Sequence, residues 1–223
     1  MRRLALFARW PAAGEVKTRL SPALPAALAL DLYRALLEDA IAVTVAAAAD
    51  ERMLYWADAP AARHGYGVPP GLRVRDQQGA DLGARIEHAF EDLIAAPGDR
   101  AVIIGTDCPA LEISALDRAF DALATHDVVM GAAHDGGYYL VGLRRRAPEL
   151  FRGIEWSTAR VLDQTLERAA KAGVSTSLLP ALDDLDTPAD LLRWIAGRAG
   201  GGGPHGPRAL DRALRAIGLL PPG

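Results

Sequence analysis

Two aspartates stand where predicted structural elements meet, and their carboxylates are candidate ligands for a metal ion. Asp107 follows the apolar run 101–104, a predicted buried strand, and precedes Pro109, which cannot continue a central strand. Asp186 precedes Thr187-Pro188, the predicted start of a helix. In an open α/β sheet, ligands bind beyond the carboxyl ends of the strands. We therefore expect Asp107 and Asp186 to hold Mg²⁺ or Mn²⁺ together with substrate phosphates and water. Helix capping is the alternative.

The loop after the first predicted strand concentrates positive charge. Arg9, Lys17 and Arg19 flank a turn that contains Gly14, in a chain whose formal net charge is -3. Guanidinium forks, a compact ammonium and a glycine that lets the backbone approach suit a phosphate group. A solvated cationic turn is the alternative. The full Gly-x4-Gly-Lys-Ser/Thr pattern is absent, which excludes a P-loop ATPase.

A third polar turn, His134-Asp135-Gly136-Gly137, separates two predicted strands. Asp135 could act as a general base, a metal ligand or an acceptor for a substrate hydroxyl, and the paired glycines allow a substrate or neighbouring backbone to approach closely. The alternative is an Asp-Gly hairpin turn. Trp156 either stacks on a substrate ring or anchors its loop. Asp184 is a possible substitute for Asp186 as a metal ligand.

Alternating strands and helices must position these groups. The predicted strands are 3–9, 52–57, 72–75, 101–104, 127–132, 138–143 and 174–179. The predicted helices are 25–48, 82–95, 114–124, 158–172 and one that starts at 188, with Asp81, Ser114 and Thr187 as N-caps and Gly173 as a C-cap. The alternation predicts a largely parallel sheet with helices on both faces.

Composition limits the class of protein. The 223 residues are 50% hydrophobic, which is enough for one domain with a full core. A pI near 6.0 gives no support to a nucleic-acid-binding or membrane-surface protein. A single cysteine, Cys108, leaves no intrachain disulfide and is expected to pack, and no apolar run is long enough to span a bilayer. We therefore expect a cytoplasmic protein without a nucleic-acid partner.

Glycine marks the boundary of the domain. We expect one domain over residues 1–196, a glycine-rich linker over 197–206 and a tail over 207–223. Residues 208–220 form an amphipathic pattern with Leu210, Leu214 and Ile217 on one side. This segment could dock on the domain, pack in a homodimer or stay loose.

Five motifs occur together and in order. They are Phe7-Ala8-Arg9-x-Pro11-x-x-Gly14-x-Val16-Lys17-Thr18-Arg19-Leu20, Gln78-Gly79-x-Asp81-Leu82-Gly83-x-Arg85, Gly105-Thr106-Asp107-Cys108-Pro109, Asp135-Gly136-Gly137-Tyr138-Tyr139-Leu140 and Asp184-x-Asp186-Thr187-Pro188-x-Asp190-Leu191. In this combination the chain resembles a bacterial family of nucleotide-diphospho-sugar transferase-like proteins, often labelled arsenosugar-biosynthesis-type glycosyltransferases, over residues 4–194. The Lys17-Thr18-Arg19-Leu20 segment is also similar to 2-phospholactate nucleotidyltransferases of the same GT-A-like superfamily. The resemblance implies an α/β, GT-A-like three-layer sandwich with a mostly parallel mixed sheet.

The resemblance also implies roles for the matching positions. The residues assigned to nucleotide and phosphate binding are Arg9, Gly14, Lys17, Arg19, Gln78, Asp81, Gly83 and Arg85. Within this set, Gln78, Asp81 and Gly83 match positions that contact the base or ribose. Asp107 and Asp186 match metal-binding acids. The residues assigned to the acceptor side are Gly136, Gly137 and Trp156.

Two departures from the superfamily patterns bear on the reaction. Position 105 is glycine, so the common Asp-x-Asp motif is absent, and Pro11-Ala12 stands where a Gly-x-Gly-x-Arg loop is usual. The first hypothesis is a metal-dependent glycosyltransferase-like enzyme that acts on a nucleoside-diphosphate sugar. In it, Lys17 stabilises the leaving diphosphate and Asp135 positions or deprotonates a small-molecule acceptor. The alternatives are a nucleotidyltransferase, which joins a nucleoside triphosphate to a phosphorylated acceptor and releases pyrophosphate, and a non-catalytic nucleotide-binding module.

Overall fold

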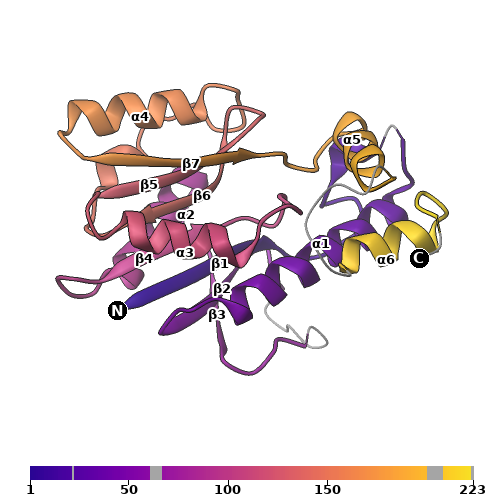
Figure 1. Cartoon of the computed structure of the whole chain (residues 1–223), viewed down its shortest axis with the longest axis horizontal. Helices are drawn as coiled ribbons and strands as arrows, with labels where there is room; N and C mark the ends of the chain where they lie inside the picture. The colour runs from indigo at the N-terminus through magenta and orange to yellow at the C-terminus, as the bar shows by residue number, and fades with distance from the viewer. Residues whose placement is uncertain (22, 61–66, 200–207, 222–223) are drawn as a thin grey trace.

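The computed structural model describes residues 1–21, 23–60, 67–199 and 208–221. In this part of the chain, seven strands form one sheet in the order β3-β2-β1-β4-β6-β5-β7 (Figure 1). The strands are β1 (Arg2–Arg9), β2 (Glu51–Ala57), β3 (Leu72–Asp76), β4 (Arg100–Ile104), β5 (Val128–Ala133), β6 (Tyr138–Leu143) and β7 (Thr176–Leu182). The central strands are apolar on both faces because helices cover the sheet on both sides; in β4, for example, the last four residues are all buried.

The directions of the strands bring most of their carboxyl ends to one edge. Strand β6 pairs antiparallel with β4 and β5, whereas the other pairs in the described sheet are parallel. Strands β1 to β5 and β7 therefore all point the same way, and β6 starts at the edge where they end. The predicted mostly parallel mixed sheet is confirmed. The turn after β7, which carries Asp184 and Asp186, accordingly reaches the same edge as Asp107.

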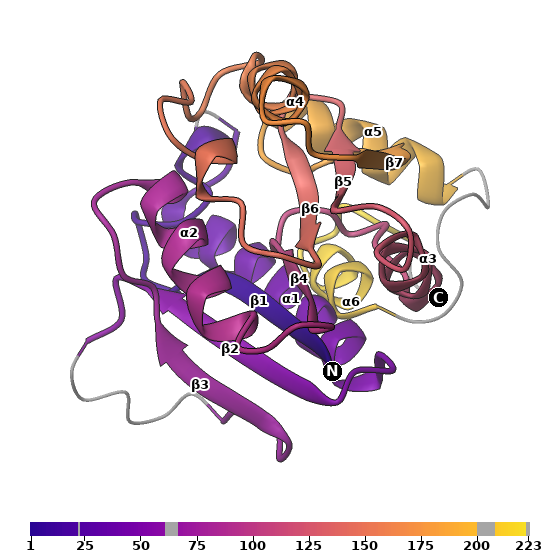
Figure 2. The ribbon, with the colours of Figure 1, turned by 90° about the vertical axis from the view of Figure 1, so that its left-hand side faces the viewer.

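Helices form the two outer layers (Figure 2). The helices are α1 (Ala26–Ala46), α2 (Leu82–Leu93), α3 (Ile113–Ala122), α4 (Val161–Lys171), α5 (Pro188–Ala199) and α6 (Ala209–Ala216), with the 3₁₀ turns η1 (Thr18–Leu20) and η2 (Pro148–Leu150). Helices α1 and α3 contribute to one buried apolar cluster with Leu4 and Leu6 of β1. Helices α2 and α4 contribute to a second cluster with Ala5 and Phe7 of the same strand, as the two-residue period of a strand requires. This is the three-layer arrangement expected from the sequence. No helix in the described residues is long and apolar enough to cross a membrane.

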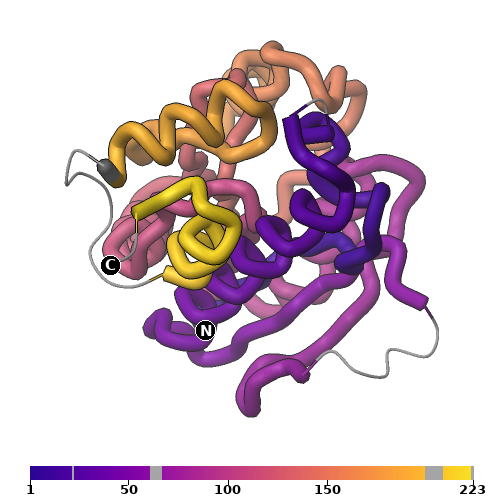
Figure 3. The backbone as a smooth tube through the Cα atoms, turned by 90° about the vertical axis from the view of Figure 1, so that its right-hand side faces the viewer, coloured from indigo at the N-terminus to yellow at the C-terminus, as the bar shows by residue number. Residues whose placement is uncertain are grey.

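The C-terminal segment docks on the domain, where Figure 1 and Figure 3 show α6 beside α1. Leu210 and Leu214 are fully buried in a third apolar cluster that includes Leu32 and Leu36 of α1. Of the three possibilities left by the sequence, the structure therefore has the docked one. Of the predicted linker, residues 197–199 belong to α5, and residues 200–206 lie outside the described residues.

Asp39 of α1 holds the start of α6 in place of a local cap. Its carboxylate accepts hydrogen bonds from Ala209 N (2.8 Å) and Leu210 N (3.1 Å), two of the N–H groups that a helix start leaves unpaired. We predict that Asp39→Ala lowers the free energy of unfolding by about 1 kcal/mol, the usual effect of losing a cap. In a chain of this size the midpoint of thermal unfolding then falls by about 2–4 °C. Asp39→Asn retains an oxygen acceptor and is the matched control; equal losses in both variants would contradict the capping role.

Some predicted element boundaries are wrong. Ser114 is not the N-cap of α3, because the helix begins one residue earlier and Glu112 occupies the cap position in an extended conformation. The helix predicted from 158 begins at Val161, after a turn. The strand predicted over 174–179 runs instead from Thr176 to Leu182. Asp81 does cap α2, where its side chain accepts from Ala84 N.

Candidate active site

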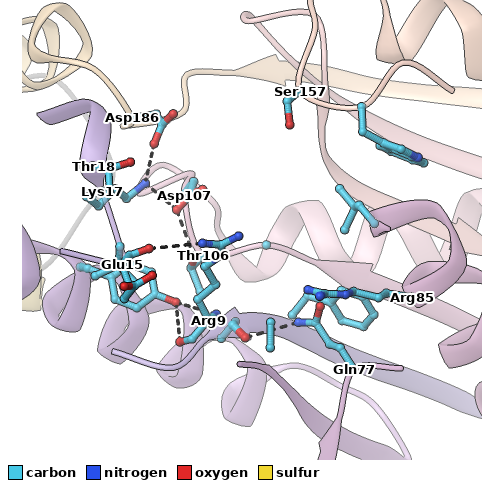
Figure 4. A pocket seen from close by; sticks show the side chains of 18 of the residues that line it. Arg9, Glu15, Lys17, Thr18, Gln77, Arg85, Thr106, Asp107, Ser157 and Asp186 are labelled. Carbon is cyan, nitrogen blue, oxygen red and sulfur yellow. Dashed lines mark hydrogen bonds and ion pairs between the residues drawn. The ribbon is translucent and has the colours of Figure 1, made fainter. Parts of the chain in front are cut away.

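A cleft of about 750 Å³ opens at the edge of the sheet where β1 to β5 and β7 end. Its walls come from β1, the loop before η1, the start of α2, the end of β4 and the turn after β7 (Figure 4). The cleft is therefore lined by segments that are far apart in the sequence. Seven of the residues predicted for the site line it: Arg9, Lys17, Arg19, Asp81, Arg85, Asp107 and Asp186, together with Trp156 from the acceptor set.

Lys17 lies at the centre of the charged wall and joins the two predicted metal-binding aspartates. Its side chain is only 2% exposed, and its ammonium lies 2.5 Å from Asp107 Oδ1 and 3.6 Å from Asp186 Oδ1. It also donates to Leu185 O at 2.7 Å. Arg19 Nη1 donates to Asp186 Oδ2 at 2.9 Å. The structure thus brings Asp107 and Asp186 to the same point, as the rule about strand ends predicts.

The backbone fixes the turn that carries Asp186. Leu185 is buried in the third apolar cluster, and its N–H donates to Asp107 O at 2.7 Å, which joins the turn after β7 to the end of β4. Asp190 Oδ2 accepts from Asp186 N (3.1 Å) and from Thr187 N (2.6 Å) at the start of α5. Asp190 is therefore a capping residue, and the Asp186 carboxylate is left to face the cleft.

Two arginines line the opposite part of the cleft, and an unpredicted aspartate lies beside both of them. The Tyr33 hydroxyl accepts from Arg9 N (2.8 Å) and donates to Arg9 O (2.9 Å), which fixes the backbone where β1 ends. Asp58, just after β2, lies 3.9 Å from Arg9 Nε and 4.0 Å from Arg85 Nη2. At these separations and exposures the pairs are weak. Each guanidinium group also donates one long hydrogen bond of 3.3 Å to a backbone carbonyl, Arg9 to Glu15 O and Arg85 to Gly79 O. Both arginines line the cleft.

Gln77, and not the predicted Gln78, lines the cleft. Gln77 Nε2 donates to Tyr55 O (3.0 Å) and Ala8 O (3.3 Å), which ties the side chain to the ends of β2 and β1 beside Arg85 (Figure 4). Gln78 lines a separate, open depression beside α2. Consecutive residues leaving an extended strand point to opposite sides, so the two glutamines face different depressions. A binding role for Gln78 stays a prediction.

Three glycines assigned to binding have other roles. A Cβ on Gly83 would lie 2.3 Å from Phe151 O and 2.9 Å from the Trp156 ring, so Gly83 lets α2 pack against the Trp156 loop. Gly14 has φ +81 and forms a turn without lining the cleft. A Cβ on Gly136 would lie 2.2 Å from Ala159 O, so backbone, and not substrate, takes that space.

Asp135 forms the hairpin turn between β5 and β6. Its Oδ1 accepts from Gly137 N at 2.8 Å, which is the local hydrogen bond of an aspartate in a turn. The hairpin alternative for this segment is therefore correct, and neither Asp135 nor Gly137 lines the cleft. Trp156 packs edge-on against Tyr138, as expected of a residue that anchors its loop. It also lines the cleft, and stacking on a substrate ring stays a prediction.

Backbone strain is concentrated around the cleft. In the described part of the chain, the non-glycine residues with positive φ are Lys17 (φ 50), Asp58 (φ 59) and Ser157 (φ 64). Lys17 and Ser157 line the cleft, and Asp58 lies between two of its arginines. Such conformations cost free energy and cluster at functional sites, so their coincidence supports assigning function to this cleft. Asp58 and Ser157 were not found from the sequence, because aspartate tolerates a positive φ but seldom adopts one, and serine does not favour it.

Asp184 carries a perturbed carboxyl group. Burial raises the pKa of Asp184 to about 6, and the negative charge of Asp135 adds to the rise. In the unfolded chain the pKa of an aspartate is near 3.9, so folding favours the protonated form between these two values. The stabilisation from this group is present below about pH 4 and is lost as the pH rises through about 6.

We therefore predict that Asp184→Asn removes this pH dependence. The measured quantity is the free energy of unfolding, obtained by urea denaturation at pH 4 and at pH 7. The difference between variant and wild type should favour the variant more at pH 7 than at pH 4. Glu167→Gln, which removes a carboxylate from a solvent-exposed position on α4, is the matched control. A stability difference between Asp184→Asn and wild type that is the same at both pH values would contradict the assignment.

The donor atoms around Lys17 have the chemistry that a magnesium or manganese ion requires. Asp107, Asp186 and the carbonyl of Leu185 all offer oxygen to one point, and Mg²⁺ is usually held by one or two carboxylates plus substrate phosphates. No group of three or more His, Cys, Asp or Glu residues in the described ranges is arranged to hold a metal ion. The residues therefore fit an ion that shares its shell with a substrate, provided that the Lys17 ammonium moves aside.

The fold and this site define the class of protein. The mixed seven-strand sheet between helices is that of the nucleotide-diphospho-sugar transferase-like folds, and the predicted fold class is confirmed. A protein from Desulfovibrio desulfuricans G20, provisionally named a nucleotide-diphospho-sugar transferase, has a TM-score of 0.88 and 28% identity over 98% of this chain and 96% of its own. A nucleotidyl transferase from Methanothermobacter thermautotrophicus has a TM-score of 0.56 and 16% identity over 97% and 99% of the two chains, and shares the fold alone.

The chain belongs to the family described as "Uncharacterized protein conserved in bacteria (DUF2064)", which matches residues 31–158. It is also 30% identical over 176 residues, 78% of this chain and 76% of the relative, to 2-phospho-L-lactate guanylyltransferase from Methanothermobacter thermautotrophicus (strain Delta H). The predicted enzyme class, a transferase, is confirmed by these relatives.

Proposed function

We propose that this chain is a nucleotidyltransferase that joins the nucleoside monophosphate part of a nucleoside triphosphate to a phosphate-bearing acceptor and releases pyrophosphate. The observation that carries the proposal is a cluster of ion pairs at the open edge of the sheet. In it, Lys17 contacts Asp107 and Asp186, and Arg19 contacts Asp186. Cations and hard oxygen ligands at one point suit a polyphosphate and its counter-ion. The similarity to a guanylyltransferase over 78% of the chain favours nucleotidyl over glycosyl transfer and makes GTP the first donor to test.

The reaction needs little from the protein beyond positioning and charge. An acceptor phosphate oxygen attacks the α-phosphorus of the triphosphate, a new P–O bond forms, and the bond to the β-phosphate oxygen breaks to release pyrophosphate. Arg9, Lys17 and Arg19 would bind the negatively charged oxygens. A Mg²⁺ or Mn²⁺ held by Asp107 and Asp186 would supply charge neutralisation to the phosphates. The rate acceleration would come mainly from this electrostatic stabilisation.

Glycosyl transfer from a nucleoside-diphosphate sugar is the second candidate. It is supported by the relative from Desulfovibrio desulfuricans G20, which matches almost the whole chain and is provisionally named a nucleotide-diphospho-sugar transferase. Its chemistry differs in the leaving group, because a nucleoside diphosphate is released in place of pyrophosphate. Asp135 would be its acceptor-activating residue. The hydrogen bond of Asp135 to Gly137 N and its position outside the cleft lend that role little support.

The two candidates are separated by ligand preference and by product. We expect GTP with Mn²⁺, at a hundredfold excess over its dissociation constant, to stabilise the chain by about 2.7 kcal/mol in thermal unfolding. GDP-mannose and UDP-glucose should stabilise it less. In ³¹P NMR, a mixture of GTP, Mg²⁺ and 2-phospho-L-lactate should give pyrophosphate. Preference for the sugar nucleotides, with release of nucleoside diphosphate, would establish the second candidate, and binding without any turnover would favour a non-catalytic module.

A further inference from the structure

We propose that Lys17 is an internal counter-ion that keeps free divalent cations away from Asp107 and Asp186 until a nucleotide arrives. The inference rests on the proposed function for its nucleotide step, but its central claim concerns the chain alone. The Lys17 ammonium has two alternative sets of partners. In the free chain it contacts carboxylates, and in the nucleotide complex it contacts phosphates.

Most of the hydrogen-bonding capacity of Lys17 is already used in this structure. An ammonium group has three donors and no acceptor. Two of them are used, because Lys17 Nζ donates to Asp107 Oδ1 at 2.5 Å and to Leu185 O at 2.7 Å. Asp186 Oδ1 lies 3.6 Å away, an ion-pair distance that is too long for a hydrogen bond. To bind a phosphate through more than one hydrogen bond, the lysine must therefore exchange partners.

The same oxygens are those that a metal ion would need. Asp107 Oδ1 cannot contact the ammonium closely and also lie about 2.1 Å from Mg²⁺ without placing two cations side by side. Asp107 is half exposed, but the Lys17 side chain is only 2% exposed, so water screens the charge of the ammonium poorly. Occupation by the ammonium and occupation by the divalent ion therefore oppose each other. The ammonium is tethered at the site, whereas a free ion must be taken from solution and partly dehydrated.

A triphosphate reverses this balance because it supplies anionic oxygens to both cations. The ion then shares its shell between the carboxylates and the phosphates, and Lys17 gains phosphate oxygens in place of Asp107. Linkage makes the effect reciprocal, so nucleotide binding strengthens metal binding by the factor by which metal strengthens nucleotide binding. The residue that would exchange partners also has a strained backbone, because Lys17 has φ 50.

The test is a Mn²⁺ titration of the full chain without nucleotide. The electron paramagnetic resonance signal of free Mn²⁺ measures how much of the ion is bound. We expect wild type to bind weakly and Lys17→Met to bind one ion at least ten times more tightly. Lys171→Met is the matched control, because Lys171 is the only other lysine, is 80% exposed on α4 and should leave Mn²⁺ binding unchanged. The double variant Lys17→Met/Asp107→Asn should return to weak binding, which places the new site on Asp107.

Each result decides the proposal. If Lys17→Met and Lys17→Gln both remain folded by circular dichroism and bind Mn²⁺ no more tightly than wild type, Lys17 is not a counter-ion that excludes metal. A second outcome is that Lys17→Met binds Mn²⁺ more tightly, as expected, but neither GTP nor a sugar nucleotide strengthens Mn²⁺ binding by wild type. The counter-ion role then stands and the proposed function fails. Tighter binding that persists in the double variant would place the ion elsewhere and overturn the proposal.

Discussion

Asp107→Asn is expected to abolish the stabilisation of the chain by nucleotide and Mn²⁺ while leaving the fold intact. Asp107 lies at the end of β4, is half exposed, and is the carboxylate closest to Lys17. Asparagine keeps an oxygen at the position that accepts from Lys17 and Thr106, so the local hydrogen bonds survive. It removes the negative charge, and a neutral amide is a much weaker partner for a divalent cation bound to phosphates.

The measurement is thermal unfolding with and without GTP and Mn²⁺. Wild type should gain about 2.7 kcal/mol at a hundredfold excess of ligand over its dissociation constant, and Asp107→Asn should gain nothing measurable. Asp121→Asn is the matched control, because Asp121 is 74% exposed on α3 and its only ion pair in the described residues is a weak one with Arg2. An Asp107→Asn chain that gains as much as wild type would show that the nucleotide site does not use this carboxylate.

The general position of the site was predictable because it follows from rules about sheets. The apolar run of β4 predicts a buried strand, and parallel strands bring their carboxyl ends to one edge. Asp107, Lys17 and Asp186 could therefore be placed together although they are far apart in the chain. What the sequence could not provide was the pairing among them. The ammonium of Lys17 contacts the two carboxylates directly, which depends on the left-handed backbone of Lys17 and on the burial of Leu185 beneath the turn.

The differences between expectation and structure arise where tertiary contacts decide what a residue faces. Gln77 and Gln78 are chemically identical, and only the direction in which the chain leaves β3 decides which of them faces the cleft. Gly83 was assigned to ligand binding from the family resemblance, and Gly136 because glycine permits a substrate or a neighbouring backbone to approach closely. The approaching groups are the Trp156 loop and the Ala159 backbone, respectively. A glycine in a sequence indicates that something comes close, and only the tertiary structure identifies what it is.

The docking of α6 shows a related limit. An amphipathic pattern over residues 208–220 predicts a helix with one apolar side, but not what covers that side. In the structure it is covered by α1, and the same cluster includes Leu20 of η1 and Leu185. Both of these residues lie in segments that carry charged groups of the cleft. The C-terminal helix therefore supports the loops of Lys17 and Asp186 from behind, a connection that no local sequence feature contains.

Lys17→Met is expected to lower kcat for nucleotidyl transfer by about 10²–10³-fold, the usual loss when one strong donor to transition-state charge is removed. Negative charge moves toward the leaving pyrophosphate during the reaction, and the ammonium is the most deeply buried cation lining the described cleft. Because the interaction would strengthen in the transition state, kcat and kcat/KM should fall together. The measurement is steady-state pyrophosphate release with GTP and the acceptor, and Lys171→Met is the control on the exposed face of α4.

Lys17→Arg is expected to restore little of this activity. The space around Nζ is set by three oxygens that converge on a compact group, and the wider planar guanidinium cannot occupy the same point. A Lys17→Met chain that keeps more than a tenth of the wild-type kcat would remove Lys17 from the reaction. The combination of slower turnover with tighter Mn²⁺ binding in this one variant is the specific expectation, because a merely structural lysine would weaken both.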